Sequence, residues 1–291
     1  MKKTYQHILE LNLAILFIST SGPLGRYIDL PVPLTIGLRA LIAAVLIFLF
    51  CKWKRFDLKI KKEDKLTVLL SGVFMCLHWI TYFYSLKLSN VAIGMISLFT
   101  YPVITAFLEP LILKTQFQRI QILFGVLVLV GIYLLVPDFD LKNNYTLALI
   151  LGVLSAVFYS LRNIITKSKV STYNGSVLML YQLLIIVILL SPFSILIEIP
   201  LIISQLPALF VLAIVTTSIG HTLFIYSFKK FTTTSASIMS SSQPVYGILL
   251  GMVLLKEFPD FHALLGGLII LSAVILESYV VYKKSKLFVE N

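Results

Sequence analysis

Two arginines lie deep inside long apolar stretches of this chain, where charged side chains are rare. Arg39 follows Pro33 within one stretch, and Arg162 lies near the middle of another. A guanidinium forms a two-point hydrogen-bonded match to a carboxylate or a phosphate, so both arginines are candidates for binding the anionic group of a small molecule. Glu109, in a third apolar stretch, could instead pair with either arginine and serve the structure alone. Both interpretations stay open from the sequence.

Three further ionisable side chains in apolar stretches could carry a proton. His78 and His221 occupy nearly corresponding places in the two halves of the chain. Histidine changes charge near physiological pH, so these two residues and Glu109 are candidates for proton coupling. The alternative for each histidine is a hydrogen bond inside a helical bundle, without titration. Glu277, near the end of the last apolar stretch, is expected to be solvated or paired.

Two prolines interrupt apolar stretches at related positions. Proline removes a helical hydrogen bond and frees a carbonyl, so Pro102 and Pro244 predict helix breaks. Transporters place binding sites near such interruptions. Tyr101, Ser242 and Gln243 stand next to these prolines and are predicted to bind substrate. Packing between helices is the alternative for the serine, because small hydroxyl residues allow close approach in lipid.

Trp79 and Tyr82 lie on the same apolar stretch as His78. Aromatic side chains at this depth can line a cavity and enclose a ligand, and we predict that both do so. Anchoring at the membrane interface is the alternative for aromatic residues near the ends of such stretches.

No motif of an enzyme or of a cofactor site is found in the sequence. His-Glu-x-x-His, a nucleophile elbow and a phosphate-binding glycine loop are all missing. Cys51 and Cys76 give neither a disulfide framework nor a metal-ligand spacing. We therefore expect no catalysis, no cofactor and no metal. Without an ATP site, active transport would have to use an ion gradient or exchange.

The composition shows which elements must position these residues. Of 291 residues, 58% are hydrophobic and only 13% are charged, and the mean hydropathy is +0.96. A helix that crosses a bilayer needs about 20 residues, so the length suits ten of them with short connections. The predicted fold class is an all-α polytopic membrane protein with ten transmembrane helices. The apolar windows fall at about 7–27, 33–50, 67–86, 91–113, 118–136, 146–167, 175–196, 207–228, 234–254 and 261–281.

The basic residues predict the orientation of these helices. With the N-terminus in the cytoplasm, 18 of the 24 Lys and Arg fall on the inside, 3 fall outside and 3 lie within or at the ends of spans. This bias favours an inner-membrane protein with both termini cytoplasmic. It also accounts for the net charge of +11 without nucleic acid. The polar loop 51–64 is interpreted as a topology anchor touching lipid headgroups, with a regulatory site as the alternative.

The two halves of the chain resemble each other. A shift of 142 residues places Tyr84–Lys87 on Tyr226–Lys229 and Pro102 on Pro244. A unit of five spans enters the membrane upside down in its second copy. Inverted repeats are typical of secondary transporters, which have their site at the repeat interface. We predict two inverted five-helix repeats, 1–137 and 138–291, around a central cavity.

These residues resemble the EamA-type transporters of the drug/metabolite transporter superfamily. The resemblance covers nearly the whole chain and rests on degenerate motifs in a specific arrangement. It is carried by Tyr84-Ser85-Leu86 before Tyr101-Pro102, Tyr226-Ser227-Phe228 before Gln243-Pro244, and Leu255-Lys256-Glu257 before Gly266-Gly267. The first half departs from the family, with Thr115 where the mate of Glu257 would lie. The resemblance implies a ten-helix fold around a cavity and transport of small metabolites, often amino acids.

The predicted function is secondary active transport of small polar metabolites, with amino-acid or related metabolite export by alternating access as the first expectation. A multidrug or lipid exporter of the same fold is the alternative. The predicted partners are a small-molecule substrate and the lipid bilayer, with no nucleic acid. The protein is expected to be a monomer or a homodimer.

Overall fold

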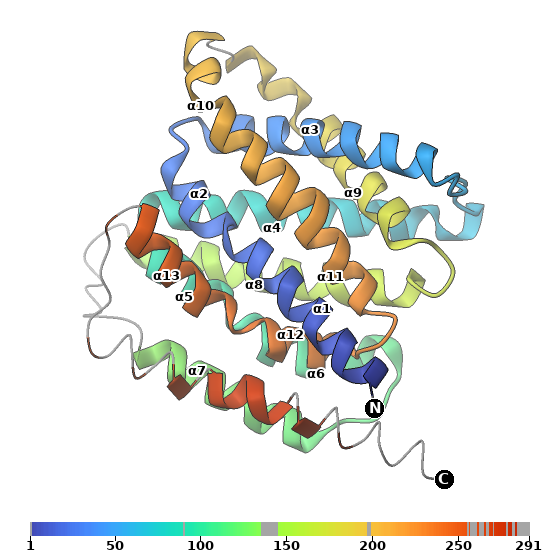
Figure 1. Cartoon of the computed structure of the whole chain (residues 1–291), viewed down its shortest axis with the longest axis vertical. Helices are drawn as coiled ribbons and strands as arrows, with labels where there is room; N and C mark the ends of the chain where they lie inside the picture. The colour runs from blue at the N-terminus through green and yellow to red at the C-terminus, as the bar shows by residue number, and fades with distance from the viewer. Residues whose placement is uncertain are drawn as a thin grey trace.

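A computed structural model shows an all-helical protein (Figure 1). It describes residues 2–89, 91–134, 145–196 and 199–254, together with 256, 261, 265, 268–269, 271–277, 279–280 and 283. The first half contains α1 (Lys2–Ser19), α2 (Ser21–Tyr27), α3 (Val32–Trp53), η1 (Lys62–Asp64), α4 (Lys65–Leu88), α5 (Val91–Leu98), α6 (Tyr101–Leu113) and α7 (Arg119–Leu134). The second half contains α8 (Tyr145–Lys169), α9 (Gly175–Leu190), η2 (Ser191–Leu196), α10 (Ile199–Val211), η3 (Leu212–His221), α11 (Thr222–Ser227), α12 (Thr233–Ser240) and α13 (Gln243–Leu254).

Seven helical stretches of the described chain are long and apolar enough to cross a membrane, and two shorter apolar helices accompany them. The last predicted window, 261–281, is described only in part. Large apolar side chains are exposed on the outer surface, for example Leu111, Ile188 and Val253. A surface of this kind suits lipid rather than water. The all-α polytopic fold class is confirmed.

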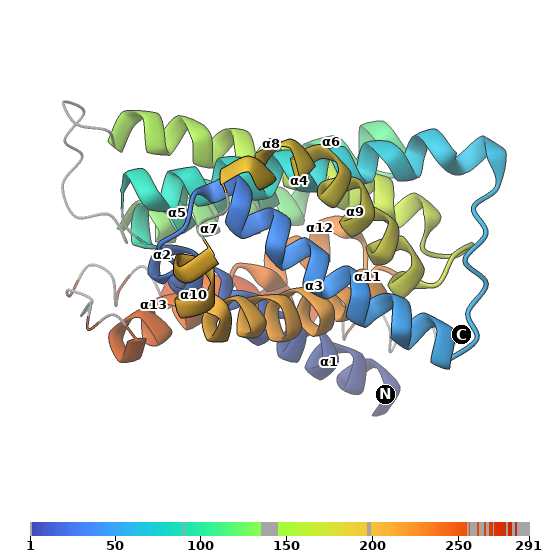
Figure 2. The same ribbon diagram turned by 90° about the horizontal axis from the view of Figure 1, so that it is seen from above.

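The helices form two layers that bring the halves of the chain together. Figure 2 shows α4, α5, α6 and α8 in one layer and α1, α10, α11 and α13 in the other. α4 packs along α8, and α1 packs along η3, so the first span of each half contacts the third span of the other half. α3 packs against α9, which pairs the second spans. Each contact between the halves thus has a counterpart when the two halves are interchanged, as expected for two structurally related repeats.

Backbone details repeat at the predicted shift of 142 residues. α6 begins at Tyr101 and α13 begins at Gln243, each with proline in its first turn. Lys114 after α6 and Lys256 after α13 both have left-handed backbones, with φ of 54° and 57°. Positive φ is uncommon for side chains of this kind, so a match at related positions supports the repeat. α5 lies beside α13 and α6 beside α12, so the two broken spans run antiparallel. The predicted boundary between 137 and 138 lies outside the described residues, as do Glu257, Gly266 and Gly267.

Small residues allow the closest approach of the two halves. A Cβ atom at Gly152 of α8 would overlap Ser97 Oγ and Ser97 Cβ of α5. A Cβ atom at Gly251 of α13 would meet nothing within 4 Å. We expect Gly152→Ala to destabilise the protein by about 1–3 kcal/mol through overpacking. Thermal melting in detergent tests this, with Gly251→Ala as the matched control, and equal melting of the two variants would contradict it.

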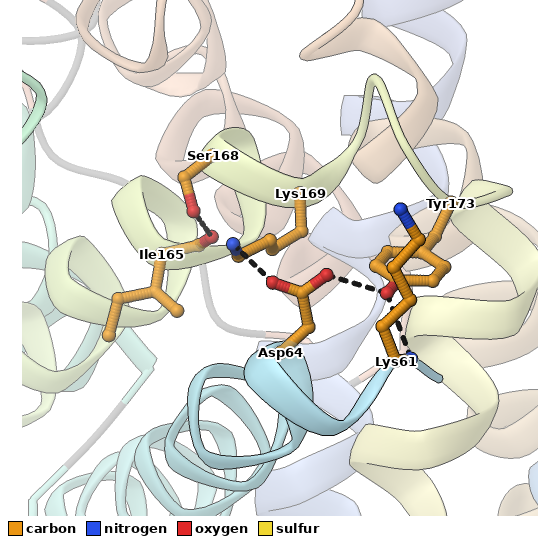
Figure 3. A network of polar contacts seen from close by, with 6 residues as sticks. All are labelled: Lys61, Asp64, Ile165, Ser168, Lys169 and Tyr173. Carbon is orange, nitrogen blue, oxygen red and sulfur yellow. Dashed lines mark hydrogen bonds and ion pairs between the residues drawn. The ribbon is translucent and has the colours of Figure 1, made fainter. Parts of the chain in front are cut away.

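A polar anchor holds the loop before α4 against the α8–α9 connection (Figure 3). Lys169 Nζ lies 2.5 Å from Asp64 Oδ1, and the Tyr173 hydroxyl donates to Asp64 Oδ2 at 2.6 Å. The Lys61 backbone N–H donates to the same hydroxyl at 3.1 Å. Burial and the hydrogen bond to Asp64 raise the pKa of Tyr173, so its hydroxyl stays protonated at neutral pH.

We expect Tyr173→Phe to loosen this anchor and to speed trypsin cleavage at Lys59, Lys61 and Lys62 several-fold. The variant removes the donor to Asp64 and the acceptor of the Lys61 N–H. Because the pKa of Tyr173 is raised, the wild-type protection should persist at neutral pH and weaken in alkaline solution, where the hydroxyl loses its proton. Tyr27→Phe, at an exposed tyrosine, is the control. Unchanged cleavage in Tyr173→Phe would show that other contacts hold the loop.

Candidate functional site

A small cavity lies between the two halves, beside the breaks that separate α5 from α6 and α12 from α13. Its volume of about 20 Å³ has room for about one water molecule. The lining side chains come from α1, α2, α4 and α5 of the first half and from α8, η3 and α13 of the second half, and therefore from both repeats. Its polar and aromatic wall consists of Ser21, His78, Trp79, Tyr82, Phe99, Tyr159, His221 and Gln243. A space of this size has no room for a metabolite, which would enter only when the walls separate.

Arg39 lies behind this wall, with its side chain fully buried. Its Nε donates to Thr217 Oγ1 at 2.7 Å, and Nη1 donates to Ser21 Oγ at 3.4 Å. The guanidinium carbon is 3.8 Å from the centre of the Trp79 ring, which is a cation–π contact. Nη2 has no hydrogen-bond partner. Arg39 therefore keeps one nitrogen with unused N–H donors next to the cavity, and no ion pair of the described residues includes it.

Thr217 reaches Arg39 because η3 is a π-helix. Its hydroxyl donates to the Leu212 carbonyl, five residues earlier, at 2.9 Å. Ser218 makes the same contact to Ala213 at 2.9 Å. Wide turns of this kind are rare and are frequent at functional sites. The π-helix ends at His221, on the cavity wall.

Arg162 is held in a different way. Its Nε and Nη2 donate to Gln182 Oε1 at 3.0 and 2.6 Å, and Nη1 donates to Asn163 Oδ1 at 2.9 Å. Gln182 in turn donates to Ser71 Oγ and Thr166 Oγ1. Each guanidinium nitrogen is thus engaged within the protein, and Arg162 is not part of the cavity wall.

Glu109 binds the beginning of α12 rather than an arginine. Its carboxylate accepts from the backbone nitrogens of Thr233 at 2.6 Å and Thr234 at 2.7 Å, and from the Thr234 hydroxyl at 2.5 Å. A carboxylate at this place satisfies helix-end donors and the helix dipole. The suggested pairing of Glu109 with Arg39 or Arg162 is therefore wrong. Glu109 instead connects the two repeats.

The two histidines differ in their partners. His78 Nδ1 lies 2.7 Å from Ser155 Oγ, and the imidazole stacks on Tyr159 with ring centres 4.2 Å apart. His221 Nδ1 has no hydrogen-bond partner, and its ring lies 5.5 Å from Trp79 across the repeat interface. Both histidines line the cavity, and the unpartnered His221 Nδ1 belongs to its wall residues.

The residues beside the prolines also separate into two groups. Gln243 lines the cavity, and its Nε2 has no hydrogen-bond partner. Tyr101 hydrogen-bonds Ser240 of α12 across the repeats and lies outside the cavity wall. Ser242 Oγ donates to the Met239 carbonyl at 3.1 Å, and so satisfies the end of α12. Pro102 and Pro244 each stand second in the helix that follows a break.

Sequence reasoning missed Tyr159 and Thr217. Tyr159 packs between His78 and His221, and its hydroxyl has no hydrogen-bond partner. Tyr159 lies on the face of α8 that packs along α4. That packing is known only from the folded structure, so the sequence carries no direct signal for this residue. Thr217 becomes important only through the π-helix, which no sequence pattern indicated.

The helices are long enough to cross a membrane, and they form two related halves that enclose a polar cavity. This architecture is typical of membrane transporters. The chain belongs to the EamA-like transporter family, which it matches over residues 8–136 and 146–279. The predicted family and the absence of an enzymatic role are thereby confirmed. The two matched segments correspond to the two halves of the fold.

Relatives agree with this assignment. A protein of Archaeoglobus fulgidus described as an uncharacterized transporter is 26% identical over 201 residues, 68% of this chain and 69% of its own length. One of Helicobacter pylori, with the same description, is 26% identical over 143 residues, about half of each chain. A solved crystal structure aligns with a TM-score of 0.77 at 16% identity, over 96% of this chain and 98% of its own, which shows the shared fold.

Proposed function

We propose that the protein is a secondary transporter of small metabolites that carry an anionic group, with amino acids as the first candidates. It would work by alternating access, with both termini in the cytoplasm. The observation that carries this proposal is Arg39, a fully buried guanidinium with an unpartnered Nη2. Within the described part of the chain, the ion pairs are those of Asp64 with Lys169 and Glu10 with His7, so no carboxylate there neutralises Arg39.

Other unused polar atoms lie at the same place. Gln243 Nε2, His221 Nδ1 and the Tyr159 hydroxyl line the cavity without hydrogen-bond partners. Buried polar groups are usually satisfied, and leaving them unpaired is costly. A ligand with a carboxylate or phosphate would supply acceptors to Arg39 and Gln243. The aromatic rings of Trp79 and Tyr82 would enclose its apolar part.

A multidrug or lipid exporter of the same fold is the second candidate. The aromatic wall favours it, since Trp79, Tyr82 and Tyr159 offer stacking surfaces to hydrophobic ligands. The buried charge of Arg39 opposes it, because a cationic drug would meet a like charge beside the cavity. The charge therefore makes the anionic class the better candidate.

Thermal stability of the purified protein with a metabolite panel tests the choice. The panel holds amino acids, organic acids, sugar phosphates, nucleobases, sugars and lipophilic cations, at mildly acidic and neutral pH. A ligand that binds only the folded state at a hundredfold excess over its Kd adds about 2.7 kcal/mol, which raises the melting temperature. We expect carboxylate-bearing compounds to do so. Stabilisation by lipophilic cations alone would favour the drug exporter.

A further inference from the structure

Glu277 is a buried carboxylate that the proposed binding site does not use. It belongs to the described helical residues 271–277, and its side chain is fully buried. Oε1 accepts a hydrogen bond from Gln121 Nε2 at 3.1 Å, whereas Oε2 has no partner. The expectation of a solvated or paired Glu277 is wrong, since no ion pair of the described residues includes it.

An ionised carboxylate in such a place is costly unless a cation or several donors compensate it. Glu277 has one amide donor and one unpartnered oxygen. Transfer of a proton from hydronium to Oε2 forms one O–H bond as one O–H bond of hydronium breaks, releases water and removes the charge of the carboxylate.

A short chain of hydrogen bonds connects Glu277 with α12. Gln121 Nε2 of α7 also donates to Ser235 Oγ at 2.9 Å, and Ser235 lies in the first turn of α12. Thr232, the N-cap of α12, donates its hydroxyl to Ser235 Oγ at 3.0 Å. The charged groups that face this turn are Glu109 of α6, which binds the next two nitrogens, and Lys167 of α8, which donates to the Phe231 carbonyl at 2.9 Å.

The other end of α12 reaches the substrate cavity. Ser240, the last residue of α12, hydrogen-bonds Tyr101, and Gln243 of the following helix lines the cavity. α12 has 8 residues, a length of about 12 Å. A shift of this helix would thus change the surroundings of Glu277 and those of the substrate together. Coupling requires such an element, with two arrangements that both ligands distinguish.

We propose that Glu277 binds the coupling proton of the transport cycle. The hydrogen bonds through Gln121 and Ser235 would couple protonation of Glu277 to the position of α12. This inference rests on the proposed function and adds the coupling ion to it. Glu277 differs from His78, His221 and Glu109 in combining full burial with a charge-bearing oxygen that no group of the described chain satisfies.

Transport in vesicles tests the coupling. The protein and its Glu277→Gln variant are reconstituted and given a radiolabelled amino-acid mixture. Gln imitates the neutral acid, so the variant should still exchange labelled for unlabelled amino acids at near wild-type rate. Its accumulation against a gradient, driven by an imposed proton gradient, should fall by at least about tenfold. Glu10→Gln, at an exposed carboxylate, is the control and should keep both activities.

Infrared spectroscopy of the purified protein tests proton occupancy without any substrate. The carbonyl band of a neutral carboxylic acid should be present in the wild type and in Glu10→Gln, and lost in Glu277→Gln. Retained accumulation by Glu277→Gln, or an unchanged band, would overturn the proposal. A wild type that exchanges but does not respond to the proton gradient would overturn it as well. If no panel ligand binds and no exchange occurs, the proposed function fails and the coupling role with it, even where the band persists.

Discussion

Replacing Arg39 with methionine is expected to abolish the response to carboxylate-bearing ligands while leaving the fold as stable as before, or more so. Loss of one partner of a buried, hydrogen-bonded charge pair costs about 2–5 kcal/mol of binding. The free protein carries the desolvation cost of the guanidinium without a described counterion. Methionine fills similar space without a charge, and such exchanges are often neutral or stabilising.

Arg162→Met is the matched comparison, because Arg162 is equally buried but fully hydrogen-bonded. We expect it to melt earlier, since it leaves Gln182 and Asn163 without their partner, and buried orphaned groups cost about 1–3 kcal/mol each. Thermal melting with and without the panel ligand measures both effects. Arg39→Lys separates charge from geometry, because lysine cannot make the two-point contact of a guanidinium. An Arg39→Met protein that still binds and transports would place the anion site elsewhere.

Apolar windows in the sequence predict the membrane-spanning helices well, because a helix inside a bilayer needs a long run of apolar side chains. A helix in a bilayer must satisfy its own backbone and present about 20 apolar residues, so each window has a structural counterpart where the chain is described. The shift of 142 residues predicted matched helix breaks at Pro102 and Pro244, and helices begin one residue before each proline, at Tyr101 and Gln243. It could not predict the π-helix 212–221, which packs against α1 and α3 and has no described π-helical counterpart in the first half.

The candidate site could be predicted only in part. A residue type indicates polarity and the free-energy cost of burial, but it does not show which groups will hydrogen-bond the side chain. His78, Trp79, Tyr82 and Gln243 were chosen as deep polar or aromatic residues, and the cavity brings them together. Arg39 and Arg162 looked equivalent along the chain. Their difference comes from Gln182, whose amide oxygen occupies the Arg162 guanidinium. Such an amide twenty residues away leaves no pattern in the sequence.

Glu277 was misjudged for a related reason. Its place near the end of a window suggested access to water, because span ends commonly lie at the membrane surface. Burial there depends on Gln121 and Ser235, which belong to other helices and meet Glu277 only in the folded chain. Tertiary contacts of this kind lie beyond what periodicity and composition express.

Removing the Glu109 carboxylate is expected to give the largest loss of stability of any single change considered for this protein. Glu109→Ala leaves two backbone N–H groups and the Thr234 hydroxyl without their acceptor, at residues that are almost completely buried. Hydrogen bonds to charged groups are worth about 1.5–3 kcal/mol each, so a loss of about 3 kcal/mol is expected even though these bonds share one carboxylate. Melting in detergent measures it, and Glu10→Ala, at an exposed carboxylate, should stay within about 0.5 kcal/mol of the wild type.

The same change should open one side of the transporter, because the Glu109 contact has no counterpart in the other half. The residue related to Glu109 by the shift of 142 is Gly251, which carries no carboxylate. Loss of the contact frees the start of α12 and should expose Ala236, which is buried in the wild type. In a protein whose buried Cys51 and Cys76 are replaced by alanine, Ala236→Cys should react faster with a membrane-impermeant maleimide once Glu109→Ala is added. The reagent should act from the side that the termini are proposed to face. Equal labelling with and without Glu109 would mean that the carboxylate stabilises α12 without closing that side, and a separate contact would have to keep the cavity occluded.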